Sequence, residues 1–352
     1  MSSPTTRKVS VPHTVRTAAE PRQNRLFTVR LSHIEEINPT VRLLHLTIPP
    51  SVQDPSLQEY VAESEEADNG QLQPFTFFPG QWLDVHIPSV ANAGGFSITS
   101  TPADAQVLPS LEPSHELIPA EEAVIVPVNS HGREPYVELA VQKVLSNPAS
   151  AWLWRPKEEI IGKELSIRVG GSFVWPPSKA KLEAIRNVVF VVGGVGINPI
   201  ISMLSHLNNN DETTGSFHAS LGIHVLYSTK LPDNVTPETG FNQIPFLSRL
   251  REIVRSQEQS RRLRITLDLF LTNNHDQSSS LPARTPQDMT IQSRRISRDD
   301  LQRMVSRAHS QSNPDETVCY VCGPPQMTDE VVDILNDLLN GHKDRIYFEK
   351  WW

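Results

Sequence analysis

The sequence predicts two successive domains, an antiparallel β-barrel followed by an α/β domain with a five-stranded parallel sheet. Short apolar runs separated by turn signals fill the N-terminal half, which is typical of an all-β barrel or sandwich. After residue 186, strand-like and helix-like segments alternate, as they do in parallel βαβ units. The length of 352 residues is sufficient for two domains. We place the barrel at residues 26–180 and the α/β domain at residues 186–352.

The strands of the barrel are expected where apolar and polar residues alternate, because a strand with one buried face has a period of two. They are Phe27–Leu31, Val41–Ile48, Trp82–Ile87, Tyr136–Val144 and Glu164–Val169. One short helix is expected in this half, at Ala149–Trp154. Ser51–Gly70 and Asp104–Glu122, which are acidic or rich in Pro, are expected to be long loops or disordered segments.

The α/β domain begins at Val188–Val192, a continuous apolar run of the kind that forms a strand buried on both faces. Further strands are expected at Gly222–Tyr227, Arg264–Leu271, Thr317–Cys322 and Arg345–Phe348. The helices between them are expected at Asn198–His206, Pro245–Arg255, Arg298–Ser306 and Met327–Leu339. Two polar stretches, Asn208–Gly215 and Asn273–Ser293, are expected to be loops.

The composition excludes several classes of function. A formal net charge of −8 gives no basic surface for nucleic acid, so no nucleic-acid partner is expected. No apolar run approaches the roughly 18 residues that a membrane span needs, so no span is expected. The two cysteines, Cys319 and Cys322, are too few for a disulfide scaffold or a four-cysteine iron–sulfur centre. An intracellular, reducing compartment fits this content best.

Residues 1–25 are basic and rich in Ser and Thr. Their charged residues are Arg7, Lys8, Arg16, Arg22 and Arg25 against one acid, Glu20. This composition suits a mitochondrial presequence, and it suits a disordered polar tail equally. The localisation therefore stays open between mitochondrion and cytoplasm.

A glycine-rich turn joins the first buried strand of the α/β domain to its helix. It reads Gly193-Gly194-Val195-Gly196-Ile197-Asn198-Pro199. Glycines let the backbone turn tightly and approach a pyrophosphate, whose charge then faces the amide groups of the helix start. Pro199 suits the first helical turn, where its missing N–H costs nothing. We expect a nicotinamide dinucleotide here; the alternative is a strand–helix turn that needs glycine only for packing.

A second cluster, Cys319-Tyr-Val-Cys322-Gly323-Pro324-Pro325-Gln326-Met327, also runs from a strand through a turn into a helix. Ligands of open α/β sheets bind beyond the carboxyl ends of the strands, so Cys322 is expected at the ligand edge. The Cys-x-x-Cys spacing also invites a redox or metal interpretation. Because an offset of three puts two side chains on opposite faces of a strand, Cys319 is expected in the core instead, and no metal site is expected.

Together, Gly193–Pro199 and the distant Cys322–Met327 resemble the ferredoxin–NADP reductase superfamily. Its members join a flavin-binding β-barrel to a nicotinamide-binding domain, in this order. The resemblance covers residues 26–352 apart from the insertions. It implies hydride transfer from NAD(P)H to a flavin, more often FAD than FMN, and onward to an unidentified protein or small-molecule acceptor. Within the superfamily, Gly94-Gly95-Phe96-Ser97 and the terminal Phe348–Trp352 resemble the subgroup of oxidoreductase NAD-binding domain-containing proteins.

The resemblance implies that the barrel binds a flavin through a short motif. Phe96-Ser97-Ile98-Thr99 matches the Arg-x-Tyr-Ser motif of the superfamily from its aromatic residue onward, which would put Ser97 near the reactive flavin nitrogen. Ser150 matches a helix start that holds the flavin phosphates.

The resemblance also implies how the C-terminal domain contributes. The residues expected to bind the dinucleotide are Gly193, Gly194, Val195, Gly196, Ile197, Asn198, Pro199, Cys322, Gly323, Pro324, Pro325 and Met327. Cys322 would lie beside the nicotinamide and act in catalysis with Ser97. Trp352 would stack on the flavin ring, with Trp351 facing away by strand alternation; the alternative is that both tryptophans make packing contacts.

Three departures from the superfamily bear on flavin. Gly94 stands where it has Arg, Phe96 where it has Tyr, and Asn147 where the phosphate-binding segment has Gly. A charge-assisted hydrogen bond contributes about 1.5–3 kcal/mol, so loss of the arginine weakens flavin binding. Two functions therefore stay open: an NAD(P)H-dependent flavin oxidoreductase, or a non-catalytic NAD(P)-binding or sensor protein whose barrel has lost its flavin. Thr272-Asn273, in place of the Ser-Arg pair of NADPH-specific members, favours NADH, while Lys230 keeps NADPH open.

Overall fold

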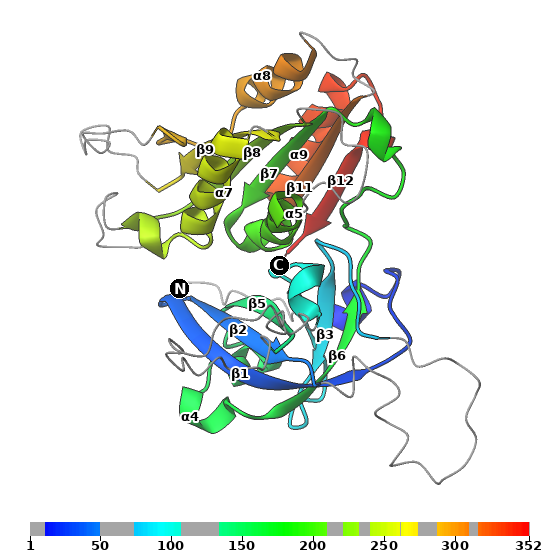
Figure 1. The fold of residues 1–352 in the computed structure, drawn as a ribbon, viewed down its shortest axis with the longest axis vertical. Helices are drawn as coiled ribbons and strands as arrows, with labels where there is room; N and C mark the ends of the chain where they lie inside the picture. The colour runs from blue at the N-terminus through cyan, green and yellow to red at the C-terminus, as the bar shows by residue number, and fades with distance from the viewer. Residues whose placement is uncertain are drawn as a thin grey trace, which may run out of the picture.

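The computed structural model describes residues 11–49, 74–106, 134–209, 221–231, 240–260, 262–273, 287–309 and 316–351. Over these residues the chain forms two sheets, one in each domain (Figure 1). The antiparallel sheet has the strand order β4-β3-β6-β1-β2-β5, and the parallel sheet has the order β10-β9-β8-β7-β11-β12. The predicted two-domain fold, a β-barrel followed by a parallel α/β sheet, is confirmed.

The barrel strands place alternate side chains in a common core, as the buried and exposed positions of the first strand show. The strands are β1 (Phe27–Asn38), β2 (Val41–Thr47), β3 (Trp82–His86), β4 (Gly94–Ser97), β5 (Tyr136–Gln142) and β6 (Glu164–Gly170). The helical segments are α1 (His13–Arg16), η2 (Pro102–Ala105), α3 (Pro148–Leu153) and α4 (Lys157–Ile160). A bridge between Ile98 and Leu139 joins the β4 edge to β5 and closes the barrel.

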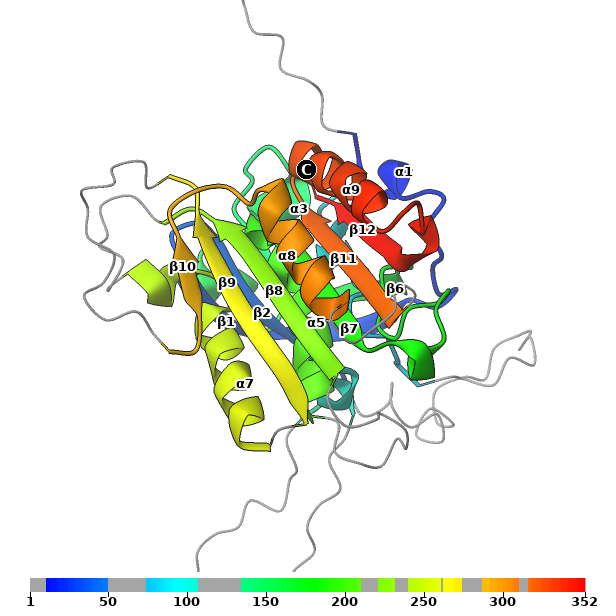
Figure 2. The ribbon, with the colours of Figure 1, turned by 90° about the horizontal axis from the view of Figure 1, so that it is seen from above.

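The α/β domain is a three-layer arrangement, with helices on both faces of its sheet (Figure 2). Its strands are β7 (Asn187–Gly193), β8 (Leu221–Thr229), β9 (Leu263–Leu271), β10 (Thr290–Gln292), β11 (Thr317–Gly323) and β12 (Ile346–Lys350). Its helices are α5 (Ile197–Asn209), α7 (Leu247–Ser260), α8 (Arg298–His309) and α9 (Pro325–Leu338), with short helical turns η3 (Leu182–Ala184), η4 (Gly194–Gly196), η5 (Phe241–Gln243) and η7 (Lys343–Arg345).

The continuous apolar run of β7 reflects its place between two layers. Val188 and Phe190 pack in the core on the side of α5 and α7. Val189 and Val191 pack on the opposite side, with residues of α8 and α9. No helix in the described ranges has both the length and the apolar character that crossing a bilayer demands.

The parallel sheet has six strands rather than the five expected, because β10 falls inside the predicted loop Asn273–Ser293. Thr290–Gln292 pairs in parallel with Asp268–Phe270 at the edge of the sheet, and only Ile291 is buried. Three residues are too few to show a strand period, so pattern alone missed it. Residues 274–286 and the loop predicted at Ser51–Gly70 lie outside the described residues, as do 107–122 and 210–215 of two other predicted loops.

Residues 11–25, the N-terminal segment, were expected as part of a disordered tail or presequence but pack against the barrel. The side chain of Asp84 is fully buried; Arg22 Nε lies 2.9 Å and Arg168 Nη2 lies 2.8 Å from its Oδ2, and His13 Nε2 lies 3.3 Å from its Oδ1. Burial alone would raise the pKa of Asp84, but these three partners outweigh burial and lower it. Cleavage at residue 25 would remove two of them.

Candidate functional site

A cleft of about 830 Å³ lies at the carboxyl ends of the parallel strands, where the topology rule expects a ligand. We call it the nucleotide cleft, after the dinucleotide that the sequence predicts beside Gly193. Its volume is within the roughly 300–1,000 Å³ that is usual for ligand sites. Its lining from the α/β domain includes Gly193, Gly194, Val195, Ser228, Thr229, Lys230, Thr272, Asn273, Pro324 and Met327. The turn between β1 and β2 closes it from the barrel side.

Two glycines shape the cleft for different reasons. Gly194 has a φ of +54°, and a Cβ there would meet nothing within 4 Å. Glycine is therefore needed here for its left-handed backbone conformation and not for space. At Gly196 a Cβ would overlap the carbonyl oxygen of Cys322 and lie 2.9 Å from the Cα of Gly323. Only glycine therefore lets η4 approach β11 this closely. The structure thus brings the two sequence motifs into contact.

Of the expected dinucleotide residues, Gly193, Gly194, Val195, Pro324 and Met327 line the cleft. Gly196, Ile197, Asn198, Pro199, Cys322, Gly323 and Pro325 are not in its wall. Cys322 is fully buried, and burial raises the pKa of its thiol well above the usual value. A protonated, enclosed thiol is not a nucleophile, so Cys322 shapes the site through its backbone. Cys319 lies in the core on the other face of β11, as predicted.

A second cavity of about 100 Å³ lies between β4 and β5, next to α1, α3 and the end of β12. We call it the seam cavity. Of the expected flavin residues, Phe96, Ser97 and Ser150 line it. It shares Gln142 and Val195 with the nucleotide cleft, so groups bound in the two spaces would be neighbours.

The remaining expected flavin residues lie elsewhere. Ile98 is fully buried in the barrel core, and Thr99 donates a hydrogen bond to Glu138 Oε1 at 2.7 Å. Trp352 lies outside the described residues. The expectation that Trp351 faces away is wrong, because Trp351 lines the seam cavity. The backbone amide of Trp351 donates to Gly323 O at 3.1 Å, so the pairing of β12 with β11 continues past Lys350. This pairing sets the direction in which the Trp351 side chain points.

Glu349 is a half-buried carboxyl group that sequence reasoning did not single out, and it lines neither the nucleotide cleft nor the seam cavity. It pairs in register with Cys322, next to Trp351. Burial and the charge of Glu20 raise the pKa of Glu349 to about 8, although the Trp351 indole opposes the shift. A carboxyl group with a raised pKa keeps its proton to a higher pH than a free one. Its position two residues before Trp351 on a strand, hence on the same face, was the available signal.

Hydrogen bonds between the two domains fix the nucleotide cleft and the seam cavity relative to each other. Asn198 Nδ2 donates to Ala140 O at 3.0 Å, and Ser202 Oγ donates to Ser100 O at 2.6 Å. Both donors are on α5, directly after the glycine loop, and both acceptors are in the barrel. The loop is therefore fixed relative to β4 and β5.

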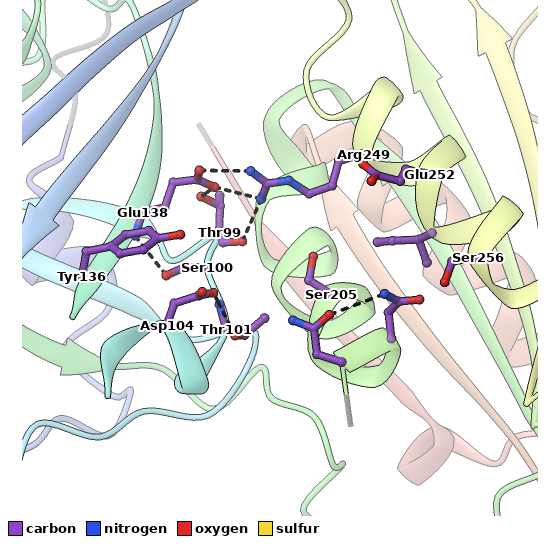
Figure 3. A pocket seen from close by; sticks show the side chains of 13 residues that line it. Thr99, Ser100, Thr101, Asp104, Tyr136, Glu138, Ser205, Arg249, Glu252 and Ser256 are labelled. Carbon is purple, nitrogen blue, oxygen red and sulfur yellow. Dashed lines mark hydrogen bonds and ion pairs between the residues drawn. The ribbon is translucent and has the colours of Figure 1, made fainter. Parts of the chain in front are cut away.

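A third, polar cavity of about 310 Å³ lies between the barrel and α5 and α7, and Figure 3 shows it. Arg249 makes a two-pronged ion pair with Glu138 there, at 2.9 and 3.0 Å. Burial alone would raise the pKa of Glu138, but His45, Arg249 and Thr99 lower it to about 2. This cavity shares no lining residue with the nucleotide cleft, and its ion pair joins the domains.

Comparison with known proteins gives relatives along the whole chain. Residues 185–336 match the family described as Ferric reductase NAD binding domain. Oxidoreductase NAD-binding domain-containing protein 1 of Danio rerio is 31% identical over 343 residues, covering 97% of each chain. The protein of the same name from Xenopus laevis is 32% identical over 281 residues, covering 79% of this chain and 71% of the relative.

Solved structures show the same fold at low identity. A ferredoxin NADP+ reductase from Neisseria gonorrhoeae with bound FAD and NADP has a TM-score of 0.55 at 13% identity, covering 94% of this chain and all of that one (100%). The cytochrome b5 reductase domain of Ulva prolifera nitrate reductase has a TM-score of 0.53 at 13% identity, covering 92% and 97%. Taken with the glycine loop and the two-domain order, these likenesses show that the chain belongs to the oxidoreductase NAD-binding domain-containing proteins and has the fold of a ferredoxin NADP+ reductase.

Proposed function

We propose that this chain is an NAD(P)H-dependent oxidoreductase that transfers a hydride from a nicotinamide in the nucleotide cleft to a flavin in the seam cavity. The observation that carries the proposal is that the two spaces share Gln142 and Val195. A ligand group at this junction contacts both spaces, which is the proximity that hydride transfer requires. The names of the relatives, and the FAD and NADP in one structural neighbour, support the same chemistry.

The residues of the seam cavity suit a flavin chemically. Ser97 and Gln142 are polar, and Phe96 and Trp351 are flat apolar surfaces. Asn198 is 6% exposed, and its Oδ1 has no hydrogen-bond partner among the described residues. An unpaired buried acceptor calls for a donor from a ligand or water. A bound flavin would supply the electron-accepting ring, which no side chain provides.

The size of the seam cavity sets a condition on flavin entry. Its volume of about 100 Å³ is below the roughly 300–1,000 Å³ that ligand sites occupy. His13 and Trp351 enclose it, with nearly parallel rings whose centroids are 6.4 Å apart. A cavity of this size holds a flavin ring only if some of the side chains that line it move aside.

The protein contributes positioning. The backbone of Gly193–Val195 borders the dinucleotide, and the bond from Asn198 to Ala140 keeps this loop against the barrel. Cys322 is proposed to fill space beside Glu349 rather than to react.

We propose NADH as the preferred donor. Asn273 exchanges two hydrogen bonds with the backbone of Leu231, at 2.9 and 2.8 Å, and Thr272 Oγ1 donates to Thr229 O at 3.2 Å. These side chains are therefore committed to joining β8 and β9. Lys230 is the one charged side chain among the described residues that line the cleft, so the 2′-phosphate of NADPH would have a single cation.

The proposal is tested by measuring both ligands on the purified full chain. Calorimetry measures NADH binding, and quenching of flavin fluorescence measures FAD and FMN binding. We expect both classes to bind, and NADH oxidation by ferricyanide to depend on added flavin. NADH binding with no flavin binding would reject the oxidoreductase in favour of a non-catalytic NAD(P)-binding protein, the function that Gly94 and the small cavity favour.

A further inference from the structure

One side of the seam cavity is made by the N-terminal segment, residues 11–25. His13 and Arg16 of α1 line the cavity together with residues of β4, β5 and α3, and with Trp351 after β12. His13 is 6% exposed, so its ring is enclosed between these elements rather than lying on the surface. The segment thus takes up space between the barrel and the end of the parallel sheet.

The ring of His13 lies in a space that suits a planar group. A Cβ at Gly95 would overlap three atoms of the imidazole, so the ring packs directly on side-chain-free backbone. The ring of Trp351 is within 7° of parallel to the imidazole, with centroids 6.4 Å apart, and Trp82 meets the imidazole edge-on at 4.6 Å. Offset parallel and edge-on contacts are the arrangements that flat rings prefer. The imidazole therefore fills a place that another flat ring could take.

The start of α3 limits which part of a flavin the seam cavity can take. Asn147 Oδ1 accepts hydrogen bonds from the amides of Ala149 and Ser150, at 3.0 and 3.2 Å. Ser150 Oγ donates to Gln142 O at 2.7 Å. The donors that a phosphate would use here already have partners within the protein. The part of a flavin that matches this place is its ring system, which stacks on aromatic side chains and needs no cation.

The second half of the N-terminal segment is bound firmly to the barrel. Gly171 N donates to Pro21 O at 3.0 Å, which joins the two backbones. Arg22 Nε donates to Oδ2 of the fully buried Asp84 at 2.9 Å, a charge-assisted hydrogen bond of the stronger kind. Residues 20–25 are therefore a fixed base.

The first half of the segment is held more loosely. His13 Nε2 faces Asp84 Oδ1 at 3.3 Å, but neither atom makes a hydrogen bond of good geometry among the described residues. Helix α1 has four residues, too few to be stable without contacts to the rest of the protein. Two of the side chains here, Val11 and Val15, are 49% and 62% exposed. Few polar contacts and exposed apolar side chains characterise a segment that opens locally, without unfolding of the domain.

We propose that residues 11–16 are an autoinhibitory lid on the flavin site. In the closed form the ring of His13 occupies the place of the flavin ring, and the lid lifts from its base at residues 20–25 before a flavin binds. The inference rests on the proposed function and deepens it, because it names the element that controls access to that site. A flavin then binds only the open form and shifts the protein toward it.

Docking of the lid is tested first, without any flavin, by the rate at which trypsin cuts the full chain after Arg16. Gly95→Ala puts a methyl group into the ring of His13, so it should lift the lid and speed this cut. In His13→Ala the ring is already absent, so the cut should be fast and the added Gly95→Ala should change its rate little. Val15→Ala removes an exposed side chain of the same helix and should match the unaltered chain. Equal rates in Gly95→Ala, His13→Ala and the unaltered chain would refute the docked lid.

Access is then measured with riboflavin, which carries the flavin ring without a phosphate. Quenching of its fluorescence gives the affinity for the unaltered chain, His13→Ala and Val15→Ala. We expect His13→Ala to bind about tenfold more tightly or better, because the affinity of a closed protein is reduced by the fraction that is open. Val15→Ala should bind as the unaltered chain does. Riboflavin added to the unaltered chain should also speed the cut after Arg16, since it binds the open form.

The outcomes separate the inference from the proposed function. If riboflavin binds the unaltered chain and His13→Ala equally well and leaves the trypsin cut unchanged, the lid is refuted while the proposed function stands. If neither chain binds riboflavin, FMN or FAD although trypsin shows the lid lifted in His13→Ala, the proposed function fails, and the site that the lid would close fails with it. Unfolding temperatures of all variants check that each is folded.

Discussion

Replacement of Gly196 by alanine should separate the glycine loop from β11. The added Cβ would overlap the carbonyl oxygen of Cys322 and lie 2.5 Å from its carbonyl carbon. Because both of these atoms belong to the backbone, neither can rotate away, and the loop or the strand must shift. Overpacking of this kind costs about 1–3 kcal/mol, and the rigid neighbours favour the upper half of that range. The midpoint of thermal unfolding should fall by roughly 4–12 °C.

The same change should weaken NADH binding in the nucleotide cleft, because Gly194 and Val195, which line it, move with the loop. We expect NADH affinity, measured by calorimetry, to fall by about tenfold or more. Gly162→Ala is the control, because Gly162 lies in the barrel, has a φ of +79°, and a Cβ there would meet nothing within 4 Å, unlike the Cβ at Gly196. It should cost about 1 kcal/mol of stability and leave NADH binding unchanged. A Gly196→Ala variant with unaltered NADH affinity and unfolding temperature would refute the packing argument.

Three further predictions follow from the charged residues. Arg249→Ala removes the two-pronged partner of Glu138, which is 4% exposed, and leaves it only His45 and Thr99, so it should lower stability by about 3 kcal/mol in denaturant unfolding. Because the folded-state pKa of Glu138 is about 2, the contribution of this carboxylate is complete above its ordinary pKa and disappears as pH falls toward 2. Lys230→Ala should raise KM for NADPH and leave KM for NADH nearly unchanged. Glu349, with a raised pKa of about 8, should make stability decline as pH rises from about 4.5 to 8, and Glu349→Gln should abolish that decline.

Each of these has a contradicting result. An Arg249→Ala protein as stable as the unaltered chain would mean that water replaces the ion pair. Equal changes for the two nucleotides in Lys230→Ala would remove Lys230 from phosphate recognition. An unchanged pH profile in Glu349→Gln would mean that this carboxyl group is ionised throughout.

The fold was predictable because its central elements have strong local patterns. The continuous apolar run of β7 and the glycine turn after it predicted a buried parallel strand and its loop, and both are where the sequence placed them. β10 was missed because a three-residue edge strand has no period of its own. β4 was missed because Gly94 and Gly95 carry no side chains to form a pattern.

The site was predicted less completely, because its missing parts depend on tertiary contacts. The N-terminal segment looks like a polar tail in sequence; only its packing against Asp84 and Trp82 gives it a place. The raised pKa of Glu349 requires the burial and the nearby Glu20 that folding provides. Cys322 was placed correctly at the end of β11. The burial of its side chain could not be inferred from the sequence, because β11 is buried on both faces and its pattern does not distinguish one position from another.

The most direct test of the central claim is the transfer of a hydride between the two spaces. Flavin-loaded protein is mixed anaerobically with NADH, and with NADH carrying deuterium at the transferred position, while the flavin absorbance is followed. The proposed function predicts that the flavin bleaches and that deuterium slows the bleaching. A flavin that stays oxidised while calorimetry shows NADH bound to the same protein would contradict it.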